Sequence, residues 1–400
     1  MIHFVCGLPG TGKTSLITEN IAQDIRTGRR ALLIVPEQQT VEVERTMLKH
    51  LPPSAQLSFE VLNFSRLANK LFRVFGGLSY HYITPGMKHL LMWQTLRELS
   101  GMLREYSTRS ANDVTLPAMM LSQVGEFKAY NISAAKLDTA AARLPEESAL
   151  RTKLEDLSLI YAAYEGMVGN AYDDNADDLG KLADLLEKNN YFNGYNIYID
   201  SFTSFTAQEY RILRRMFAQA DNVTVTLAVD SPYSDAVELS SISDTARRLV
   251  VEAGDNAKIT TLDKFHRFSS PELMRIGQSL WRFEATGETL GDIPEDARGA
   301  ISILRCKSPY AEAEAVANQI LTLLSSGYRR REIAVIARDA ESYRGIIDSA
   351  LEKAGIAFFL SEKTDLPAKP LVSMIFSALA IKTRNWRSND VIAYLKSGIP

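Results

Sequence analysis

Short apolar runs alternate with stretches of helical spacing over the first forty residues. Residues 2–5 and 31–35 are continuous apolar runs of the kind that is buried in a parallel sheet. Between them, residues 15–26 place apolar side chains at intervals of three and four, and Gly28 follows as a typical helix stop. The pattern therefore predicts a strand–helix–strand unit with parallel strands.

The same alternation continues on both sides of a long helical stretch. Residues 57–62 predict another strand, and helical spacing follows it up to the pair Gly76-Gly77. From about residue 85 to residue 188 the chain is nearly all helical in pattern, with Leu, Met and Tyr recurring at three and four. Buried strands return at residues 197–199 and 223–229. The pattern thus predicts an α/β domain interrupted by a helical insertion.

A third group of strands and helices begins near residue 300. Strands are expected at residues 301–304, 333–337 and 357–360, and helices at residues 310–324 and 342–354. We therefore expect a first α/β domain at residues 1–84 and 190–299, a helical insertion at residues 85–189, and the start of a second α/β domain at residues 300–400. Because helical spacing continues to the last residue, we expect the second domain to be truncated and the chain to be the N-terminal part of a longer subunit.

The composition excludes several classes of protein. Hydrophobic residues make up 46% of the chain and charged residues 23%, which is typical of a folded rather than a disordered protein. No apolar run approaches the roughly 18 residues needed to cross a bilayer. Cys6 and Cys306 are the only cysteines, and the five histidines are scattered without metal-ligand spacing. These features predict a reduced, cytoplasmic protein with no membrane partner and no metal cage of its own.

Charge is unevenly distributed around a net value of −3. Lys and Arg exceed Asp and Glu by five over residues 1–110, whereas acidic residues exceed basic ones by eight over residues 111–200. The basic excess is compatible with a local nucleic-acid footprint on a near-neutral protein. The acidic stretch at residues 173–178 is most simply a solvated loop or a helix start, with calcium binding as the alternative.

The firmest local signal is a glycine-rich loop between the first predicted strand and the first predicted helix. Residues 7–14 read Gly-Leu-Pro-Gly-Thr-Gly-Lys-Thr, which matches the P-loop pattern in full. Glycines let backbone N–H groups turn inward around phosphates, and the helix N-terminus adds positive potential. Lys13 would reach the β- and γ-phosphates of ATP, and the Thr14 hydroxyl would ligate Mg²⁺. The residues expected to hold the nucleotide here are Gly7, Gly10, Thr11, Gly12, Lys13 and Thr14.

Hydrolysis at a P-loop also needs an aspartate that holds the metal ion, with a carboxylate nearby to activate water. Residues 197–199 form an apolar run that ends in Asp200, the best candidate for the metal-holding position. An ordinary strand-end aspartate in a turn is the alternative interpretation. Ser201 follows it, where a helicase would place glutamate, and Asp230 after the next strand could face the same cleft.

Several segments taken together resemble a known family. The P-loop resembles that of superfamily 1 helicases, and the combination of segments closely resembles AddB, the B subunit of the AddAB helicase–nucleases that process broken DNA ends. The segments that carry the resemblance are residues 33–40 (LIVPEQQT), 61–68 (VLNFSRLA), 198–206 (YIDSFTSFT), 332–339 (EIAVIARD), 355–359 (GIAFF) and 366–371 (LPAKPL). It covers essentially the whole chain and implies a P-loop NTPase fold with a superfamily 1 helicase-like sheet domain, a helical insertion and the start of a second RecA-like domain.

The resemblance also implies contacts with DNA and with the γ-phosphate. Asn63, Phe64, Ser65 and Arg66 lie where helicases of this superfamily place a motif that touches single-stranded DNA. Stacking of Phe64 on a base would contribute roughly 1–3 kcal/mol, and the alternative is that Phe64 belongs to the core and Arg66 is an ordinary surface charge. Arg338 matches an arginine that contacts the γ-phosphate in active relatives, with a surface arginine as its alternative.

Departures from the helicase pattern indicate a poor motor. Asp200 corresponds to the first aspartate of the helicase Asp-Glu-x-x-Asp motif, but Ser201 replaces its glutamate and Ser204 its second aspartate. Tyr233 stands where a glutamine is expected after Asp230. These changes agree with the family picture, in which this subunit is a helicase-like scaffold that scans DNA for the Chi recombination sequence. We therefore expect ATP and Mg²⁺ as cofactors and slow hydrolysis by this chain alone.

The family resemblance implies further parts and partners. The family carries a C-terminal nuclease domain and a cysteine-ligated iron–sulfur cluster, neither of which can be located in these 400 residues, so both are expected outside this chain. The implied partners are an AddA-type helicase/nuclease subunit and single- and double-stranded DNA. The alternatives are an active superfamily 1 motor, an unrelated P-loop phosphotransferase, and a structural interaction module with a vestigial P-loop.

Overall fold

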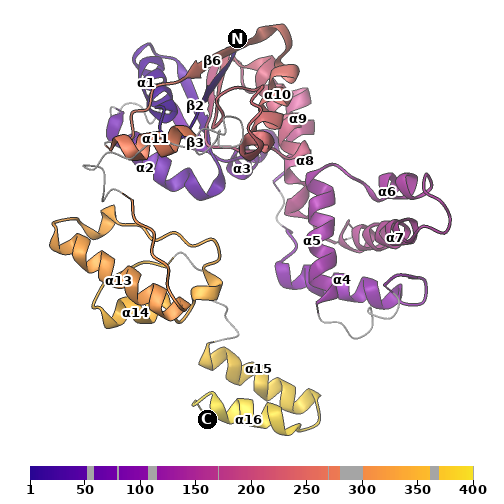
Figure 1. Ribbon diagram of the computed structural model, residues 1–400. Coiled ribbons are helices and arrows are strands. Elements are labelled where there is room, and N and C mark those ends of the chain that lie inside the picture. The colour runs from indigo at the N-terminus through magenta and orange to yellow at the C-terminus, as the bar shows by residue number, and fades with distance from the viewer. Residues whose placement is uncertain are drawn as a thin grey trace. The chain divides into compact units, whose positions relative to one another are not determined.

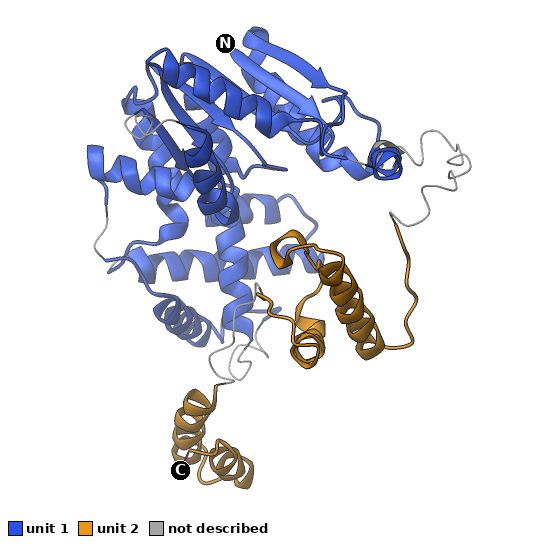
Figure 2. Ribbon diagram, turned by 90° about the vertical axis from the view of Figure 1, so that its left-hand side faces the viewer, with its two compact units in different colours: residues 1–300 blue, residues 301–400 orange. Residues whose placement is uncertain are grey.

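The structure is a computed structural model that describes residues 1–51, 58–78, 81–106, 115–169, 171–268, 270–279, 301–360 and 369–399. Residue 57, the first residue of the strand predicted at 57–62, lies outside these ranges. So do residues 366–368 of the segment 366–371 that resembles the family. The chain divides into two compact units, residues 1–300 and residues 301–400, which Figure 2 distinguishes by colour. Each unit is described by itself.

A six-stranded sheet forms the centre of the first unit. Its strands are β1 (Ile2–Gly7), β2 (Arg30–Ile34), β3 (Phe59–Leu62), β4 (Tyr195–Ile199), β5 (Asn222–Leu227) and β6 (Ala257–Leu262). They pair in the order β3-β2-β4-β5-β1-β6, and every pairing is parallel. The predicted α/β class is confirmed. The pattern had not predicted β6, because this edge strand mixes exposed and half-buried residues without an apolar run and includes Lys258 and two threonines.

Helices cover both faces of the sheet (Figure 1). Apolar residues of α1 (Lys13–Arg26) and α2 (Thr40–His50) form the core on one face, together with alternate residues of β2 and β3. The other face carries α3 (Phe64–Phe75), α8 (Asp178–Lys188), α9 (Ala207–Gln219) and α10 (Ser240–Ala253). Covering on both sides explains why the strands read as continuous apolar runs.

A second core lies within the helical stretch of the first unit. It is built by α4 (Pro85–Glu98), α5 (Leu116–Ala129), α6 (Ala134–Ala141) and α7 (Ala149–Gly169), and its fully buried members include Met92 and Tyr164. α8 falls inside the stretch expected to form the insertion, yet Leu182 and Leu186 of this helix belong to the sheet core. The helices of the separate core therefore end with α7.

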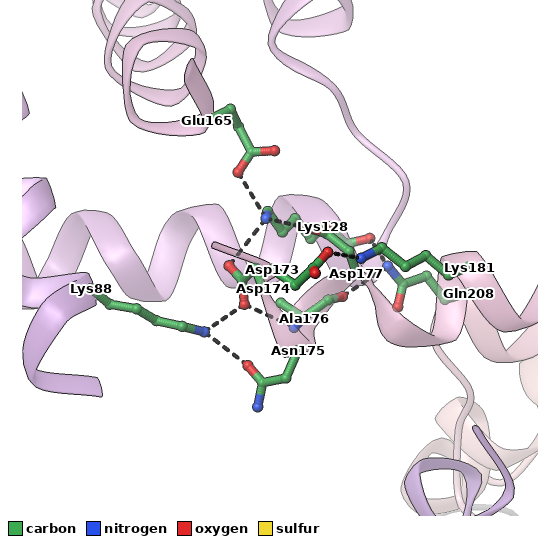
Figure 3. A network of polar contacts seen from close by, with 10 residues as sticks. All are labelled: Lys88, Lys128, Glu165, Asp173, Asp174, Asn175, Ala176, Asp177, Lys181 and Gln208. Atoms are coloured by element: carbon green, nitrogen blue, oxygen red, sulfur yellow. Dashed lines mark hydrogen bonds and ion pairs between the residues drawn. The ribbon is translucent and has the colours of Figure 1, made fainter. Parts of the chain in front are cut away.

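The acidic stretch after α7 surrounds a buried lysine (Figure 3). The Lys128 side chain of α5 is 3% exposed, and its Nζ lies 2.8 Å from Glu165, 3.1 Å from Asp174 and 2.9 Å from Asp177. We call these four residues the Lys128 cluster. Asp174 also pairs with Lys88 at 2.6 Å. The stretch does lead into a helix start, since α8 begins at Asp178, but Asp174 is buried and not solvated. The lysine ammonium supplies the positive charge that the calcium alternative had assigned to a metal ion.

The Lys128 cluster joins the helical core to the sheet domain. Gln208 of α9 donates from its side-chain amide to the backbone oxygens of Lys128 at 2.8 Å and Ala176 at 3.2 Å. Asp174 and Asp177 lie at a single 3₁₀ turn, η3 (Asn175–Asp177), which leads directly into α8, whereas Glu165 belongs to α7. Carboxylates hold Lys128 in its charged form, and the pKa of Lys128 is raised despite the opposing effect of burial.

The second unit contains the predicted helices but no paired strands within its described residues. α13 (Pro309–Ser325) and α14 (Ile347–Lys353) share a small core, and α15 (Pro370–Thr383) pairs with α16 (Ser388–Lys396). The runs at residues 301–304, 333–337 and 357–360 form no strand ladder, so the strand predictions there were wrong. An apolar run supplies strand propensity but not the neighbouring backbone that a strand must bond. Ile303, Ile336 and Phe359 are consequently at least 90% exposed.

The remaining short elements connect these parts. They are α11 (Pro271–Ser279) and the 3₁₀ turns η1 (Glu37–Gln39), η4 (Val237–Leu239), η5 (Gly254–Asn256), η7 (Arg330–Glu332) and η8 (Glu341–Tyr343). None of the helices in the described parts of the chain is long and apolar enough to cross a membrane.

Replacing Lys128 with methionine is expected to lower the free energy of unfolding by about 3–5 kcal/mol, because it removes the buried cation shared by three carboxylates, of which Asp174 is itself buried. Lys181→Met is the matched control, since Lys181 pairs with Asp173 on the surface, where both side chains are 43% exposed and the pair contributes about 0–1 kcal/mol. Urea denaturation of both variants measures the difference. Equal midpoints for the two variants would show that the Lys128 cluster is not a principal source of stability.

Candidate nucleotide-binding site

The parallel sheet brings the predicted nucleotide-binding loop and the two strand-end aspartates to one edge. In parallel strands all carboxyl ends point the same way, so the P-loop after β1, Asp200 after β4 and Asp230 after β5 share an edge. The β1–β5 and β4–β5 pairings place these segments on adjacent strands, with β5 between the P-loop strand and the Asp200 strand. Ligands of open α/β sheets bind in this location.

The P-loop has the backbone conformation that its glycines permit. Gly10 and Gly12 have φ values of +97° and +88°, in the left-handed region that side chains disfavour. Gly12 is also the N-cap of α1, so the free N–H groups of the first helical turn follow directly after the loop. Thr11 closes the loop by donating from its hydroxyl to the backbone oxygen of Leu8 at 2.9 Å. The loop and helix end together form a cradle suited to an anion.

Lys13 folds back over this cradle. Its Nζ donates to the backbone oxygens of Gly7 at 2.5 Å and Leu8 at 3.0 Å. Burial lowers the pKa of Lys13, and the nearby Arg267 lowers it further, while Asp200 acts in the opposite direction. A partly desolvated cation beside a second positive charge favours the approach of a phosphate.

Asp200 lies between two threonine hydroxyls. The Thr14 hydroxyl donates to Asp200 Oδ2 at 3.2 Å, and the Thr226 hydroxyl on β5 donates to Asp200 Oδ1. Asp200 is only 6% exposed, and its backbone N–H bonds to Ile34 on β2. Hydroxyl and carboxylate oxygens are the ligands that Mg²⁺ takes beside a nucleotide. Thr14 and Asp200 therefore lie within hydrogen-bonding distance, although they are far apart in sequence. Two residues that hold the same metal ion must lie close together in this way.

A segment that the sequence analysis had not singled out lies against the P-loop. The backbone N–H groups of His266 and Arg267 both donate to the Gly10 oxygen, at 2.8 and 3.3 Å. A Cβ atom on Gly10 would come within 3.3 Å of Arg267 and Phe268, so the close approach also favours glycine there. Residues 263–268 follow an edge strand that the pattern had not predicted, which is why Arg267 was missed.

The position after Asp200 carries no second carboxylate. Ser201 is exposed and has a φ of +68°, an uncommon value for a residue other than glycine. Ser204 is also exposed. Asp230 is half-buried. Burial of the Cys6 thiol, together with the negative charge of Asp230, raises the pKa of Cys6 to about 11. Within the described ranges, no group of three or more His, Cys, Asp and Glu side chains is arranged to hold a metal ion.

The segment expected to touch DNA divides into buried and exposed residues. Asn63 is the N-cap of α3 and accepts a hydrogen bond from the backbone N–H of Arg66 at 2.7 Å. Phe64 is 4% exposed and packs edge-on against Phe202 and Phe205. A base cannot stack on a ring enclosed in this way, so Phe64 is a core residue in this structure. Ser65 and Arg66 remain at the surface.

Arg338 belongs to the second unit, where its side chain is exposed. Its expected contact with a γ-phosphate stays a prediction.

A parallel sheet with a P-loop after β1 and a buried aspartate after β4 defines the class of P-loop α/β domains. Comparison with known families then narrows this class. A family model described as "ADDB, N-terminal" matches residues 4–276, and the chain belongs to this family.

Curated relatives agree with this assignment. Proteins named as the B subunit of an ATP-dependent helicase/deoxyribonuclease are similar to the whole chain: 32% identical in Acetivibrio thermocellus and 29% in Clostridium tetani, each over 100% of this chain. The relative in Caldanaerobacter subterraneus is 28% identical over 99% of it. The chain spans 35–36% of the length of these relatives.

Replacing Phe64 with alanine is expected to lower the free energy of unfolding by about 3–5 kcal/mol, the range for a large side chain removed from a core. Phe75 lies on the same helix and is 41% exposed, with an edge-on contact to Tyr191. Phe75→Ala should therefore cost only about 1 kcal/mol. Urea denaturation compares the two. A small loss for Phe64→Ala would restore the interpretation that this ring is available to DNA.

Proposed function

We propose that this chain is the ATP-binding, DNA-contacting, helicase-like N-terminal part of the B subunit of an ATP-dependent helicase/deoxyribonuclease. The observation that carries the proposal is the approach of Thr14 to Asp200 at 3.2 Å beside a complete P-loop. The names of the relatives support the same interpretation, since each describes a subunit of an ATP-dependent helicase and nuclease.

The residues at the sheet edge fit ATP with Mg²⁺. Mg²⁺ would supply positive charge that neutralises the phosphate oxygens. Thr14 and Asp200 would hold it, while the backbone N–H groups of the P-loop and the first turn of α1 bind the phosphates. Lys13 would exchange its bonds to the Gly7 and Leu8 oxygens for bonds to phosphate. Arg267 contributes a second positive charge close to Lys13.

Hydrolysis by this site should be slow. Water attack on a γ-phosphate requires a residue that orients the water and accepts its proton. Ser201 follows Asp200 where a glutamate would stand in an active motor, and a serine hydroxyl is a far weaker base than a carboxylate. The subunit would then serve as a nucleotide-binding scaffold, a pseudo-helicase, rather than as a motor.

The wider role follows from the family. We propose that the assembled enzyme processes DNA double-strand breaks for recombinational repair, that this subunit scans for Chi, and that its partner is an AddA-type helicase/nuclease subunit in the cytoplasm. Residues 300–400 would begin a second RecA-like domain, with Arg338 directed to the nucleotide. The nuclease domain and the iron–sulfur cluster would belong to the part of the relatives that this chain does not span.

Single-stranded DNA would cross the carboxyl edge of the sheet near the start of α3. The excess of basic residues over residues 1–110 provides positive charge for a DNA strand. Arg66 is exposed, and its ion pair with Glu44 is long, at 3.9 Å, with both side chains about half exposed. Such a pair contributes little, so the guanidinium can turn to a phosphate at small cost. The DNA contact would therefore be made by Ser65 and Arg66 rather than by Phe64.

Lys13→Ala is expected to abolish binding of ATP in the presence of Mg²⁺, because it removes the cation that meets the β- and γ-phosphates. Lys49→Ala, which removes an exposed lysine from α2, should leave the affinity unchanged. Titration calorimetry measures both. Equal ATP affinity for Lys13→Ala and the parent protein would contradict the assignment of Lys13.

The same samples test the pseudo-helicase proposal through phosphate release. With saturating single-stranded DNA, turnover should stay well below the roughly 1–100 per second of phosphoryl-transfer enzymes. A DNA-stimulated rate within that range would favour an active motor. Binding of ATP without any affinity for DNA would favour an unrelated phosphotransferase.

Arg66→Ala is expected to weaken binding to single-stranded DNA of any sequence, because one phosphate contact is lost. The slope of the logarithm of the binding constant against the logarithm of the salt concentration should become shallower by roughly 0.7. Arg73→Ala is the matched control, since this exposed arginine lies two turns further along α3, away from the carboxyl edge of the sheet. Fluorescence anisotropy at several salt concentrations measures both. Identical slopes for the two variants and the parent protein would contradict the assignment of Arg66 to the DNA-binding site.

A further inference from the structure

The threonine that holds Asp200 is buried at the centre of the sheet. Thr226 lies on β5, which is paired on one side with β1 and on the other with β4. Its direct partner on β1 is Val5, two residues before the P-loop begins, and the neighbouring Val225 pairs with Ile199, the residue before Asp200. Thr226 is 2% exposed. Its hydroxyl is thus enclosed between the P-loop strand and the Asp200 strand.

Burial of this hydroxyl needs a specific reason. A hydroxyl removed from water without a partner costs free energy, and valine has nearly the same shape without that cost. β5 uses valine at residues 223 and 225 on its other face, where the side chains join the sheet core. At Thr226 the hydroxyl is satisfied by Asp200 Oδ1. The polar residue therefore stabilises a particular arrangement of the Asp200 carboxylate.

In that arrangement the two oxygens of the Asp200 carboxylate have different partners. Oδ1 accepts from Thr226, deep between the strands, while Oδ2 faces Thr14 at 3.2 Å. A carboxylate held at one oxygen cannot rotate freely about its terminal bond, so the second oxygen keeps its direction. Groups that orient a metal ligand in this way often change metal affinity by about 10–100-fold when removed.

We propose that Thr226 is a positioning residue for the nucleotide-bound Mg²⁺: its hydroxyl fixes the Asp200 carboxylate so that Oδ2 is presented beside Thr14. The inference rests on the proposed function, because it concerns the metal ion at the same site. Thr226 acts through Asp200 and has no contact of its own with the ligand in this scheme.

The experiment compares ATP affinity with Mg²⁺ and with EDTA in the full chain. Thr226→Val should weaken binding of ATP by about 10–100-fold with Mg²⁺ and leave the affinity in EDTA unchanged. Thr226→Ser, which keeps the hydroxyl, should retain most of the Mg²⁺-dependent affinity. Thr224→Val is the matched control, since Thr224 lies on the same face of β5 two residues earlier and is 8% exposed, and it should bind like the parent.

A double-mutant cycle identifies the route of the effect. Because Thr226 acts through Asp200, Thr226→Val should cause no further loss of Mg²⁺-dependent affinity in a protein that already carries Asp200→Ala. Independent losses that multiply in the double variant would contradict the inference. Thr226→Ala is measured alongside, because it removes the hydroxyl without adding a methyl group and tests the same loss if Thr226→Val fails to fold.

The outcomes distinguish this inference from the proposed function. If the parent protein shows no Mg²⁺-dependent binding of ATP, the proposed function fails and the inference fails with it. If the parent binds and both Thr226→Val and Thr226→Ala bind equally well with Mg²⁺, the positioning role alone is overturned. Equal losses with Mg²⁺ and with EDTA would also overturn it, since they would indicate a general distortion of the P-loop.

Discussion

Parallel pairing of β5 with both β1 and β4 is the constraint on which the site depends. It places the P-loop, Asp200 and Asp230 at one edge of the sheet. The P-loop and Asp200 are nevertheless nearly two hundred residues apart in the chain. It also places Thr226 between the two strands whose ends carry the chemistry. A change of register by one residue would turn the Thr226 side chain to the opposite face and separate it from Asp200.

The helical core depends on a different interaction, the buried charges around Lys128. Removing a lysine from water is costly, and the cost is offset here by three carboxylates within 3.1 Å. The same segment leads into α8, and Gln208 ties it to α9, the helix that follows β4 and Asp200. The helical region is therefore joined to the sheet domain by directional contacts as well as by the chain itself.

The site combines features of a nucleotide binder with features that disfavour catalysis. The cradle, the paired Thr14 and Asp200, and the second positive charge at Arg267 are all suited to a metal-bound triphosphate. Under the proposed function, Ser201 stands where active motors carry a water-orienting glutamate. The proposed binding without efficient turnover would suit a subunit in which the nucleotide stabilises one conformation, because a ligand that binds only one state shifts the population toward that state.

The sequence by itself determined the local features of this protein. Continuous apolar runs predicted β1, β2, β4 and β5, and the P-loop was evident from eight residues. Helical spacing predicted α1, α3, the helices between residues 85 and 188, α13 and α14, but it had not singled out α2, α9, α10 or α11. Periodicity and motifs are properties of short segments, so features of this kind can be recognised from the sequence. The strand runs at residues 301–304, 333–337 and 357–360 show the limit, because propensity without a bonded neighbour makes no sheet.

Only the tertiary structure decided which side chains meet. Lys128 is 46 residues from Asp174, and Thr226 is 26 residues from Asp200, so no local pattern could reveal either contact. The burial of Phe64 depends on Phe202 and Phe205, which arrive from another strand end, and the approach of Arg267 to the P-loop depends on an edge strand with no clear apolar pattern. The partner of a polar or aromatic side chain is set by how distant segments pack, because burial and hydrogen bonding act through space and not along the chain.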